Sequence, residues 1–192
     1  LPGNVSNSDA LDGDVFINEA LLSDPTLFPF VVSHEIGHSL GLSHPFDGYV
    51  SDNNSTNYET VLTYDQAYIL PNTVMPNDIK AVEFLYGGND HANLEDNNYT
   101  WQTYDELNFR NSIIDKGGDD TFDFSSQSTG VFVNLSQDSW SDLSYNGSNI
   151  YMSMSNVVDD YIVDTWVPEN GHIYISTGTD IENITGSNYD DF

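Results

Sequence analysis

Apolar residues recur at helical spacing in the stretch that leads up to Gly41. Val32, Ile36 and Leu40 follow one another at four-residue intervals, which is the spacing of one helix face. A helix-start signal precedes them at residues 23–25, where Ser or Asp can cap and Pro is tolerated in the first turn. Pro29 leaves the start open within residues 23–29. The sequence predicts a helix that ends at Gly41, since glycine is a natural helix stop.

A second helix is predicted over residues 76–86. Asn77 or Asp78 can cap its start, and Gly87 followed by Gly88 can end it. Its apolar side is supplied by Ile79, Val82, Phe84 and Leu85.

Short β-type runs make up most of the remaining pattern. One run, residues 14–18, precedes the first helix and is flanked by turn residues. After about residue 87, Gly, Asn, Asp, Ser and Thr separate the clearest strands, which are residues 112–115, 121–124, 130–135 and 173–175. The change from helical to β-type patterns near residue 87 predicts an α+β chain with two domains, 1–87 and 88–192.

The charge balance narrows the range of partners. The 192 residues carry 3 Lys+Arg against 31 Asp+Glu, a net charge of −28, and no cysteine. Such a chain has no basic patch for nucleic acid or an anionic membrane surface, and its self-repulsion would be relieved by high salt or bound cations. Without disulfides, calcium is one option for stabilising the fold. The alternative is that the acidity serves only solubility or salt adaptation.

Three of the 5 histidines fall in one eleven-residue window, His34 to His44. A helix places His34 and His38 on one face about one turn apart. Gly41 allows the left-handed backbone that reverses the chain, so that His44 can return to the same point. Three protein ligands with one open position are the arrangement of a catalytic zinc site.

Glu35 adjoins the first of these histidines. Its carboxylate can reach a zinc-activated water rather than the metal, and can act as the general base. The alternatives are a helix with scattered histidines, which the full pattern disfavours, and a zinc site that does not cleave.

These residues resemble the serralysin branch of the metzincin zinc metalloproteases. The letters HEIGHSLGLSHP, residues 34–45, are similar to the zinc signature of that family. Further similar segments are residues 13–18 (its edge strand), 78–87 (its last catalytic-domain helix), and 115–125 and 181–187 (its calcium-binding, RTX-like β-roll). The resemblance covers nearly the whole chain. It implies a metzincin-like zinc subdomain with an active-site helix, followed by an all-β parallel β-roll or β-sandwich segment.

The resemblance also implies a role for Tyr64. Leu62 stands where the family has the methionine of its Met-turn, and Tyr64 keeps the tyrosine two residues later. Leu for Met nearly conserves volume, so a tolerated packing change is expected. Tyr64 is then a candidate zinc ligand in the resting enzyme and a candidate hydrogen-bond donor to the oxyanion.

Candidate calcium ligands lie in the second half. Asp115, Gly117, Gly118 and Asp120 supply carboxylates and carbonyls in one turn before a predicted strand, and the resemblance implies a calcium ion there. Asp191 lies in what resembles one degenerate RTX repeat, in which its carboxylate would be the ligand. Ordinary turn chemistry is the alternative at both places.

Together these features predict a secreted, extracellular, zinc-dependent endopeptidase with Zn²⁺ and Ca²⁺ as cofactors and protein or peptide substrates. A bacterial source in a marine or salt-rich setting is expected. Both chain ends look internal to a longer protein, and the family's earlier strands and helix would come from a missing N-terminal segment or another chain. The alternative is a non-catalytic structural or adhesive module of a larger RTX-type protein that retains a zinc site.

Overall fold

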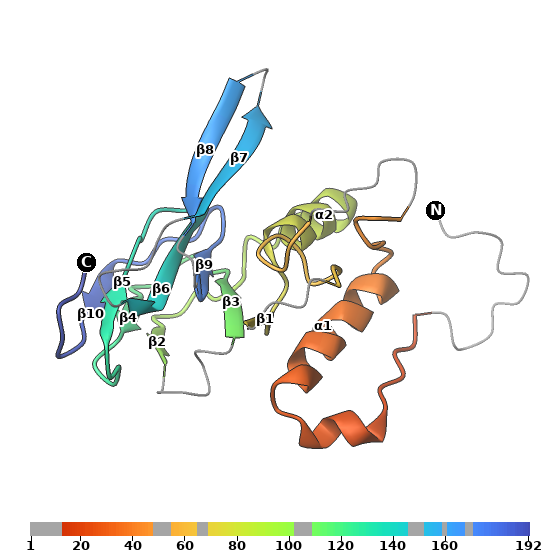
Figure 1. Cartoon of the computed structure of the whole chain (residues 1–192), viewed down its shortest axis with the longest axis horizontal. Helices are drawn as coiled ribbons and strands as arrows, with labels where there is room; N and C mark the ends of the chain where they lie inside the picture. Colours follow the sequence, from red (N-terminus) through yellow and green to blue (C-terminus); the bar gives the residue numbers. More distant parts are fainter. Residues whose placement is uncertain are drawn as a thin grey trace, which may run out of the picture. The chain divides into compact units, whose positions relative to one another are not determined.

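A computed structural model describes residues 13–47, 55–64, 69–101, 109–145, 152–158, 161–167 and 171–192. The chain divides into two compact units, Leu1–Asn89 and Asp90–Phe192. The first contains the helices and the second contains most of the strands (Figure 1). A mixed α+β chain is therefore confirmed, whereas the assignment of domains 1–87 and 88–192 to a zinc subdomain and a β-roll stays a prediction.

The first unit contains a 3-10 helix η1 (Glu19–Ser23), the helices α1 (Leu27–Ser39) and α2 (Pro76–Tyr86), and a two-residue strand β1 (Leu70–Pro71). Asp24 caps α1, because its Oδ1 accepts hydrogen bonds from the backbone N–H groups of Thr26 and Leu27 at 3.1 and 2.9 Å. α2 has the predicted bounds and ends at Gly87, whose φ is +88°.

The prediction of a strand at residues 14–18 is wrong. These residues are extended without assignment to any sheet among the described residues, and η1 follows them directly. Phe16 is 76% exposed. A strand exists only when a neighbour satisfies its backbone groups, and the described part of the chain places none beside this segment.

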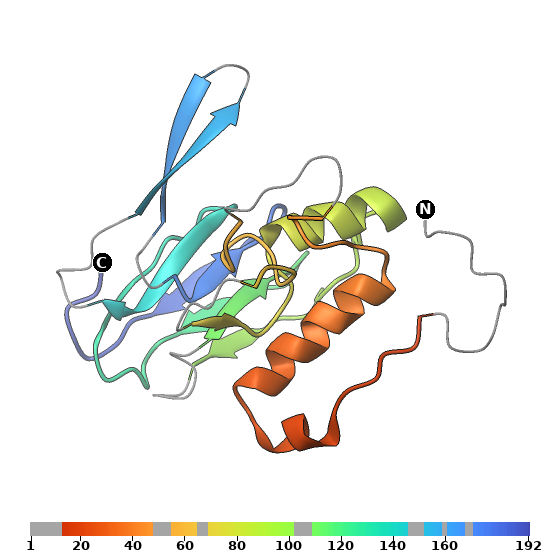
Figure 2. The ribbon, with the colours of Figure 1, turned by 45° about the vertical axis from the view of Figure 1, so that its right-hand side comes forward.

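The second unit contains two sheets and a hairpin. Figure 1 and Figure 2 show β3, β9 and β6 side by side within a sheet in which β3 runs parallel to β9 and β6 runs antiparallel to it, with β5 beyond β6. A parallel three-stranded sheet has the order β10-β4-β2, and β7 pairs with β8. The bounds are β2 Asn98–Thr100, β3 Phe109–Ile113, β4 Thr121–Asp123, β5 Gly130–Phe132, β6 Ser139–Tyr145, β7 Met152–Val158, β8 Tyr161–Val167, β9 Ile173–Ile175 and β10 Asn183–Thr185.

The predicted strands of this unit are largely present, with shifted ends. Residues 173–175 form β9 as predicted. β3 (Phe109–Ile113) overlaps the predicted strand 112–115, but both of its ends lie earlier in the chain. Phe122 and Phe124 are fully buried, and their ring centroids lie 5.9 Å apart on one face, as the alternation predicted. They belong to the core of the unit, which comprises Trp101, Phe122, Phe124, Val131, Leu143, Ile173, Ile175 and Ile181.

Within the described ranges, no helix is both long enough and apolar enough to cross a membrane.

Candidate metal centre

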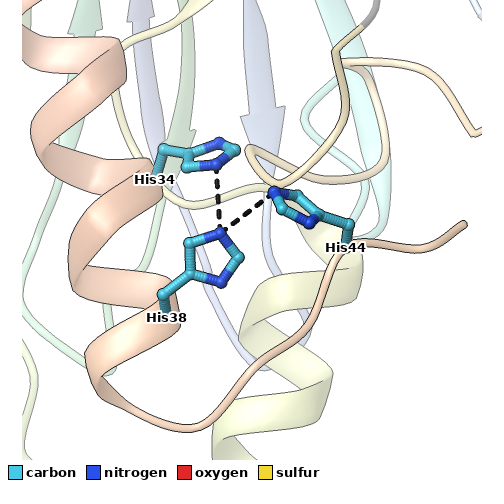
Figure 3. A group of neighbouring side chains, drawn as sticks. All are labelled: His34, His38 and His44. Atoms are coloured by element: carbon cyan, nitrogen blue, oxygen red, sulfur yellow. Dashed lines mark hydrogen bonds between the residues drawn. The ribbon is translucent and has the colours of Figure 1, made fainter. Parts of the chain in front are cut away.

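The first two histidines stand on α1, and the third stands on the loop after it. The helix ends in a Schellman motif: Leu42 N–H donates to the Gly37 carbonyl at 3.1 Å, and Gly41 N–H donates to the His38 carbonyl at 2.9 Å. Gly41 has a φ of +90°, which glycine adopts without strain. This reversal returns the chain, as predicted, and brings His44 to the other two rings (Figure 3).

The three rings point their Nε2 atoms at one place. His38 Nε2 lies 3.1 Å from His34 Nε2 and 3.1 Å from His44 Nε2. The candidate ligand atoms all lie within 4.8 Å of one another. Two nitrogens bound at about 2.0–2.1 Å to one tetrahedral zinc ion would be about 3.3 Å apart. The spacing therefore suits three ligands of one small cation.

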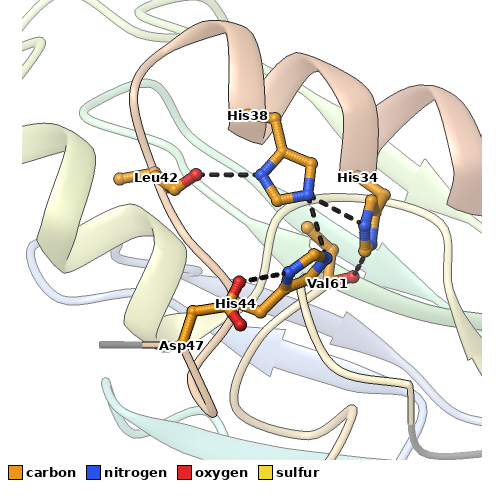
Figure 4. A network of polar contacts seen from close by, with 6 residues as sticks. All are labelled: His34, His38, Leu42, His44, Asp47 and Val61. Carbon is orange, nitrogen blue, oxygen red and sulfur yellow. Dashed lines mark hydrogen bonds and ion pairs between the residues drawn. The ribbon is translucent and has the colours of Figure 1, made fainter. Parts of the chain in front are cut away.

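The opposite nitrogen of each ring is held by an oxygen atom (Figure 4). His34 Nδ1 lies 2.8 Å from the Val61 carbonyl oxygen, His38 Nδ1 lies 2.9 Å from the Leu42 carbonyl oxygen, and His44 Nδ1 lies 2.8 Å from Asp47 Oδ2. Carbonyl and carboxylate oxygens accept, so each Nδ1 is assigned the proton and each Nε2 keeps its lone pair. Three lone pairs that converge in this way are unfavourable unless a cation lies among them. The donor set therefore fits zinc.

The electrostatics of His34 favour the neutral ring that a metal requires. Burial is the largest effect and lowers the pKa of His34 below its ordinary value, and the neighbouring His38 acts in the same direction. The hydrogen bond to Val61 and the negative charge of Glu35 oppose this shift in the pKa. Glu35 itself is half-buried on α1.

Tyr64 also reaches the site. Its ring stacks on His34, with centroids 5.7 Å apart and an interplanar angle of 15°, and packs against His44 at 4.8 Å. Its side chain is 64% exposed. Leu62 is buried beneath α1, where a methyl group added at Gly37 would lie 3.1 Å from Leu62 Cδ2. The structure thus brings His34, His38, His44 and Tyr64 together, and Glu35 follows His34 on α1. Their roles as ligands, base and oxyanion donor stay predictions.

Sequence reasoning missed the groups that hold these residues. The sequence predicts Asp78 only as a possible helix cap, and its Oδ2 does accept the Met75 N–H at 2.9 Å. The same buried carboxylate accepts the Thr60 hydroxyl at 2.5 Å and the Val61 N–H at 2.8 Å. Burial raises the pKa of Asp78. Asp78 therefore fixes the residue whose carbonyl orients His34, a link across 17 residues that has no local signal.

The predicted calcium turn in the second unit gathers buried carboxylates. Asp115 and Asp120 are both fully buried. Tyr99 donates its hydroxyl to Asp115 Oδ2 at 2.5 Å, and Asn97 N–H donates to Asp120 Oδ1 at 2.8 Å. Asp120 Oδ2 has no hydrogen-bond partner within the described ranges. A buried carboxylate oxygen without a donor is costly, and a hard cation would satisfy it.

The pKa of Asp120 is raised, first by burial and then by the negative charges of Asp115 and Glu182. Glu182, which sequence reasoning did not select, accepts the Asp120 N–H at 2.8 Å. Gly117 and Gly118 adopt φ values of +156° and +138°. At Gly118 a methyl group would overlap the Glu95 carbonyl oxygen, so the turn requires glycine there.

Asp191 has different surroundings. Its oxygens accept from Val131 N–H at 3.0 Å, Ser187 N–H at 2.8 Å and the Ser187 hydroxyl at 2.7 Å. The two contacts with Ser187 are those of the turn-chemistry alternative, and a calcium role for Asp191 stays a prediction.

Known proteins similar to this chain are serralysins. The chain is 30% identical over 160 residues to the serralysins of Photorhabdus laumondii and Photorhabdus luminescens, an alignment that covers 68% of this chain and 33% of each relative. Serralysin B of Dickeya chrysanthemi is 29% identical over 162 residues. No protein-family model matches the chain. The chain spans about a third of the length of the relatives it matches, and the similarities support a serralysin-family relationship.

Proposed function

We propose that this chain carries the zinc-binding part of a secreted metalloendopeptidase that hydrolyses peptide bonds. The observation that carries the proposal is the convergence of three Nε2 lone pairs, each fixed by an oxygen acceptor behind its ring. The relationship to proteins named serralysins supports the protease class.

His34, His38 and His44 would hold the zinc ion. When bound, zinc supplies a Lewis acid that acidifies water and polarises a carbonyl group. Glu35 lies next to His34 in sequence and acts on the His34 ring through its charge. It accepts the proton of the attacking water and delivers it to the leaving amine.

Tyr64 would donate its hydroxyl to the oxygen on which negative charge develops. Packing against His34 and His44 supports this role, because it keeps the tyrosine ring at the centre. The metzincin grouping, which rests on the pattern from His34 to His44, belongs to the same proposal.

The second unit would be a calcium-stabilised RTX-type β-roll or β-sandwich. Asp115, Asp120 and the carbonyl groups of the Gly117–Gly118 turn would supply oxygen ligands. The unpartnered Asp120 Oδ2, fully buried, is the feature that supports calcium over ordinary turn chemistry. Extracellular location accords with the absence of cysteine and the net charge of −28.

The test is hydrolysis of casein or a quenched peptide by the full-length protein. Activity should vanish with a zinc chelator and return when zinc is restored. Glu35→Gln should lower the rate by about 10²–10⁴-fold while the protein still binds zinc, because the side chain can no longer accept a proton. Glu19→Gln makes the same chemical change on the exposed η1 and should have no effect.

Failure of the zinc- and calcium-loaded, folded protein to cleave would support the alternative, a non-catalytic structural or adhesive module. An unchanged rate in Glu35→Gln would remove the proposed base.

A further inference from the structure

His44 differs from the other two histidines in how its backbone is held. His34 and His38 stand on α1, whereas His44 stands on a loop. A turn follows it at once: Asp47 N–H donates to the His44 carbonyl at 3.0 Å. Pro45 occupies the second position of this turn, where its fixed φ is favourable. The turn therefore places residues 46 and 47 at fixed positions relative to His44.

Asp47 contacts the imidazole as well as the backbone of His44. Its Oδ2 lies 2.8 Å from His44 Nδ1, and the side chains of His44 and Asp47 are 17% and 58% exposed. The corresponding acceptors for His34 and His38 are backbone carbonyls, from Val61 and Leu42. His44 is therefore the histidine of the three whose Nδ1 faces a charged side chain.

Phe46 packs on the same imidazole. Its ring is nearly parallel to that of His44, with centroids 4.8 Å apart and an angle of 9°. It also contacts Tyr64 at 5.3 Å, and Tyr64 in turn contacts His44 at 4.8 Å. Three aromatic rings thus pack together at the loop-borne histidine, and the half-buried Phe46 is the one that no proposed chemical step uses.

We propose that Phe46 and Asp47 are positioning residues that act together on His44. The hydrogen bond to Asp47 keeps the proton on Nδ1 and the lone pair on Nε2, and the stacked Phe46 ring fixes the plane of the imidazole. Two constraints of this kind give a loop residue the fixed direction that α1 gives His34 and His38. The inference rests on the proposed zinc centre and names residues that act through one of its ligands.

A purely structural role makes a different prediction. An exposed ion pair contributes little to folding stability, and Phe46 could simply cover apolar surface. In that case, changes at these positions would alter folding stability without altering metal binding. Zinc affinity separates the two roles.

The experiment is a zinc titration of the full-length protein against a competing chelator. Asp47→Ala should weaken zinc affinity by about 10- to 100-fold, as is typical when the partner behind a ligand is lost. Asp47→Asn should retain most of the affinity, because its amide oxygen still accepts from Nδ1. Phe46→Leu should weaken affinity by about two- to tenfold, and Phe46→Tyr should bind like the wild type, since it keeps the flat ring.

Two matched controls lie on exposed positions elsewhere. Asp90→Asn removes one negative charge, and Phe84→Leu changes a phenylalanine that is 89% exposed on α2. Neither should change zinc affinity. The visible absorption of the cobalt-substituted protein gives a second readout, which should change in Asp47→Ala and Phe46→Leu because the ligand field changes when His44 turns.

Wild-type zinc affinity and an unchanged cobalt spectrum in both Asp47→Ala and Phe46→Leu would overturn the inference and leave the zinc centre intact. If the wild type bound no zinc, or if His44→Ala bound it as tightly as the wild type, the proposed centre would fail, and this inference would fail with it.

Discussion

The two units of the chain arrange the polar groups of their proposed cation sites in opposite ways. In the first, three imidazoles converge and each is fixed from behind by an oxygen acceptor. In the second, the carboxylates of Asp115 and Asp120 are fully buried, and one oxygen of Asp120 has no donor within the described ranges. The first arrangement relies on direction and neutral lone pairs, which suit zinc. The second relies on charge and hard oxygen, which suit calcium.

The largest expected effect separates the two centres by metal. His38→Ala removes the imidazole whose Nε2 lies between the other two. Zinc affinity should fall by more than the roughly 100-fold typical of losing a partner behind a ligand, while calcium affinity stays unchanged. Parallel zinc and calcium titrations measure both. A loss of calcium binding in His38→Ala would contradict the separation of the two sites.

Two glycine-to-alanine substitutions, one in each unit, should differ in their effect on folding stability. Gly118→Ala should lower the free energy of unfolding by about 2–5 kcal/mol, because an L side chain at this positive φ is strained and would overlap the Glu95 carbonyl oxygen. Gly37→Ala should change it by less than about 1 kcal/mol, since the gain in helix propensity offsets a close contact with the flexible Leu62 side chain.

Tryptophan fluorescence can follow the unfolding of the second unit. The tryptophans, Trp101, Trp140 and Trp166, all fall within residues 90–192. Denaturant unfolding followed by fluorescence should therefore report the Gly118→Ala loss directly. Equal destabilisation by Gly118→Ala and Gly37→Ala would show that backbone conformation at residue 118 is not the constraint.

Removal of one carboxylate tests the calcium turn. Asp120→Asn should weaken calcium affinity by roughly tenfold or more, because ligand charge sets calcium affinity, and should leave zinc affinity unchanged. Asp119→Asn is the matched control, since Asp119 is exposed next to it. A similar loss in both variants would indicate general electrostatics rather than a site.

The same carboxylate should make the proposed calcium binding depend on pH. Burial and the nearby charges raise the pKa of Asp120, so protons compete with calcium at a higher pH than for an ordinary Asp. Calcium affinity should fall as the pH is lowered through this raised pKa. Without calcium, pH acts on folding stability in the opposite direction. The contribution of Asp120 to the free energy of unfolding is fully present while its carboxyl group is protonated, and it is lost as the pH rises through its folded-state pKa. Calorimetric calcium titrations over that range measure the effect, and Asp120→Asn should flatten it.

The smallest expected effect concerns Leu62. Leu62→Met is nearly volume-conserving and should change the free energy of unfolding by less than about 1.5 kcal/mol. Zinc affinity should stay close to that of the wild type, because Leu62 packs on Gly37, whereas the three Nδ1 atoms are held by Val61, Leu42 and Asp47. A large gain in zinc affinity would show that packing beneath α1 limits the centre.

The features that sequence predicted are those with local signals. α2 has the predicted bounds, and Gly41 reverses the chain because a left-handed residue is needed after α1. The meeting of His34, His38 and His44 follows from the same local geometry.

The features that sequence missed depend on distant partners. Residues 14–18 have strand-like composition but no neighbour in the described structure. Asp78 and Val61 orient His34 through contacts that span 17 and 27 residues. Asp47 is the exception, because an Asp three residues after a histidine, with Pro between them, is a turn signal that could have been found.

The most direct test of the central claim is a crystal structure of the zinc-loaded protein with anomalous data collected at the zinc edge. The account predicts one zinc peak bound by the Nε2 atoms of His34, His38 and His44, with the remaining position open to solvent or taken by Tyr64. A peak elsewhere, or a zinc ion closed off by another protein side chain, would contradict it.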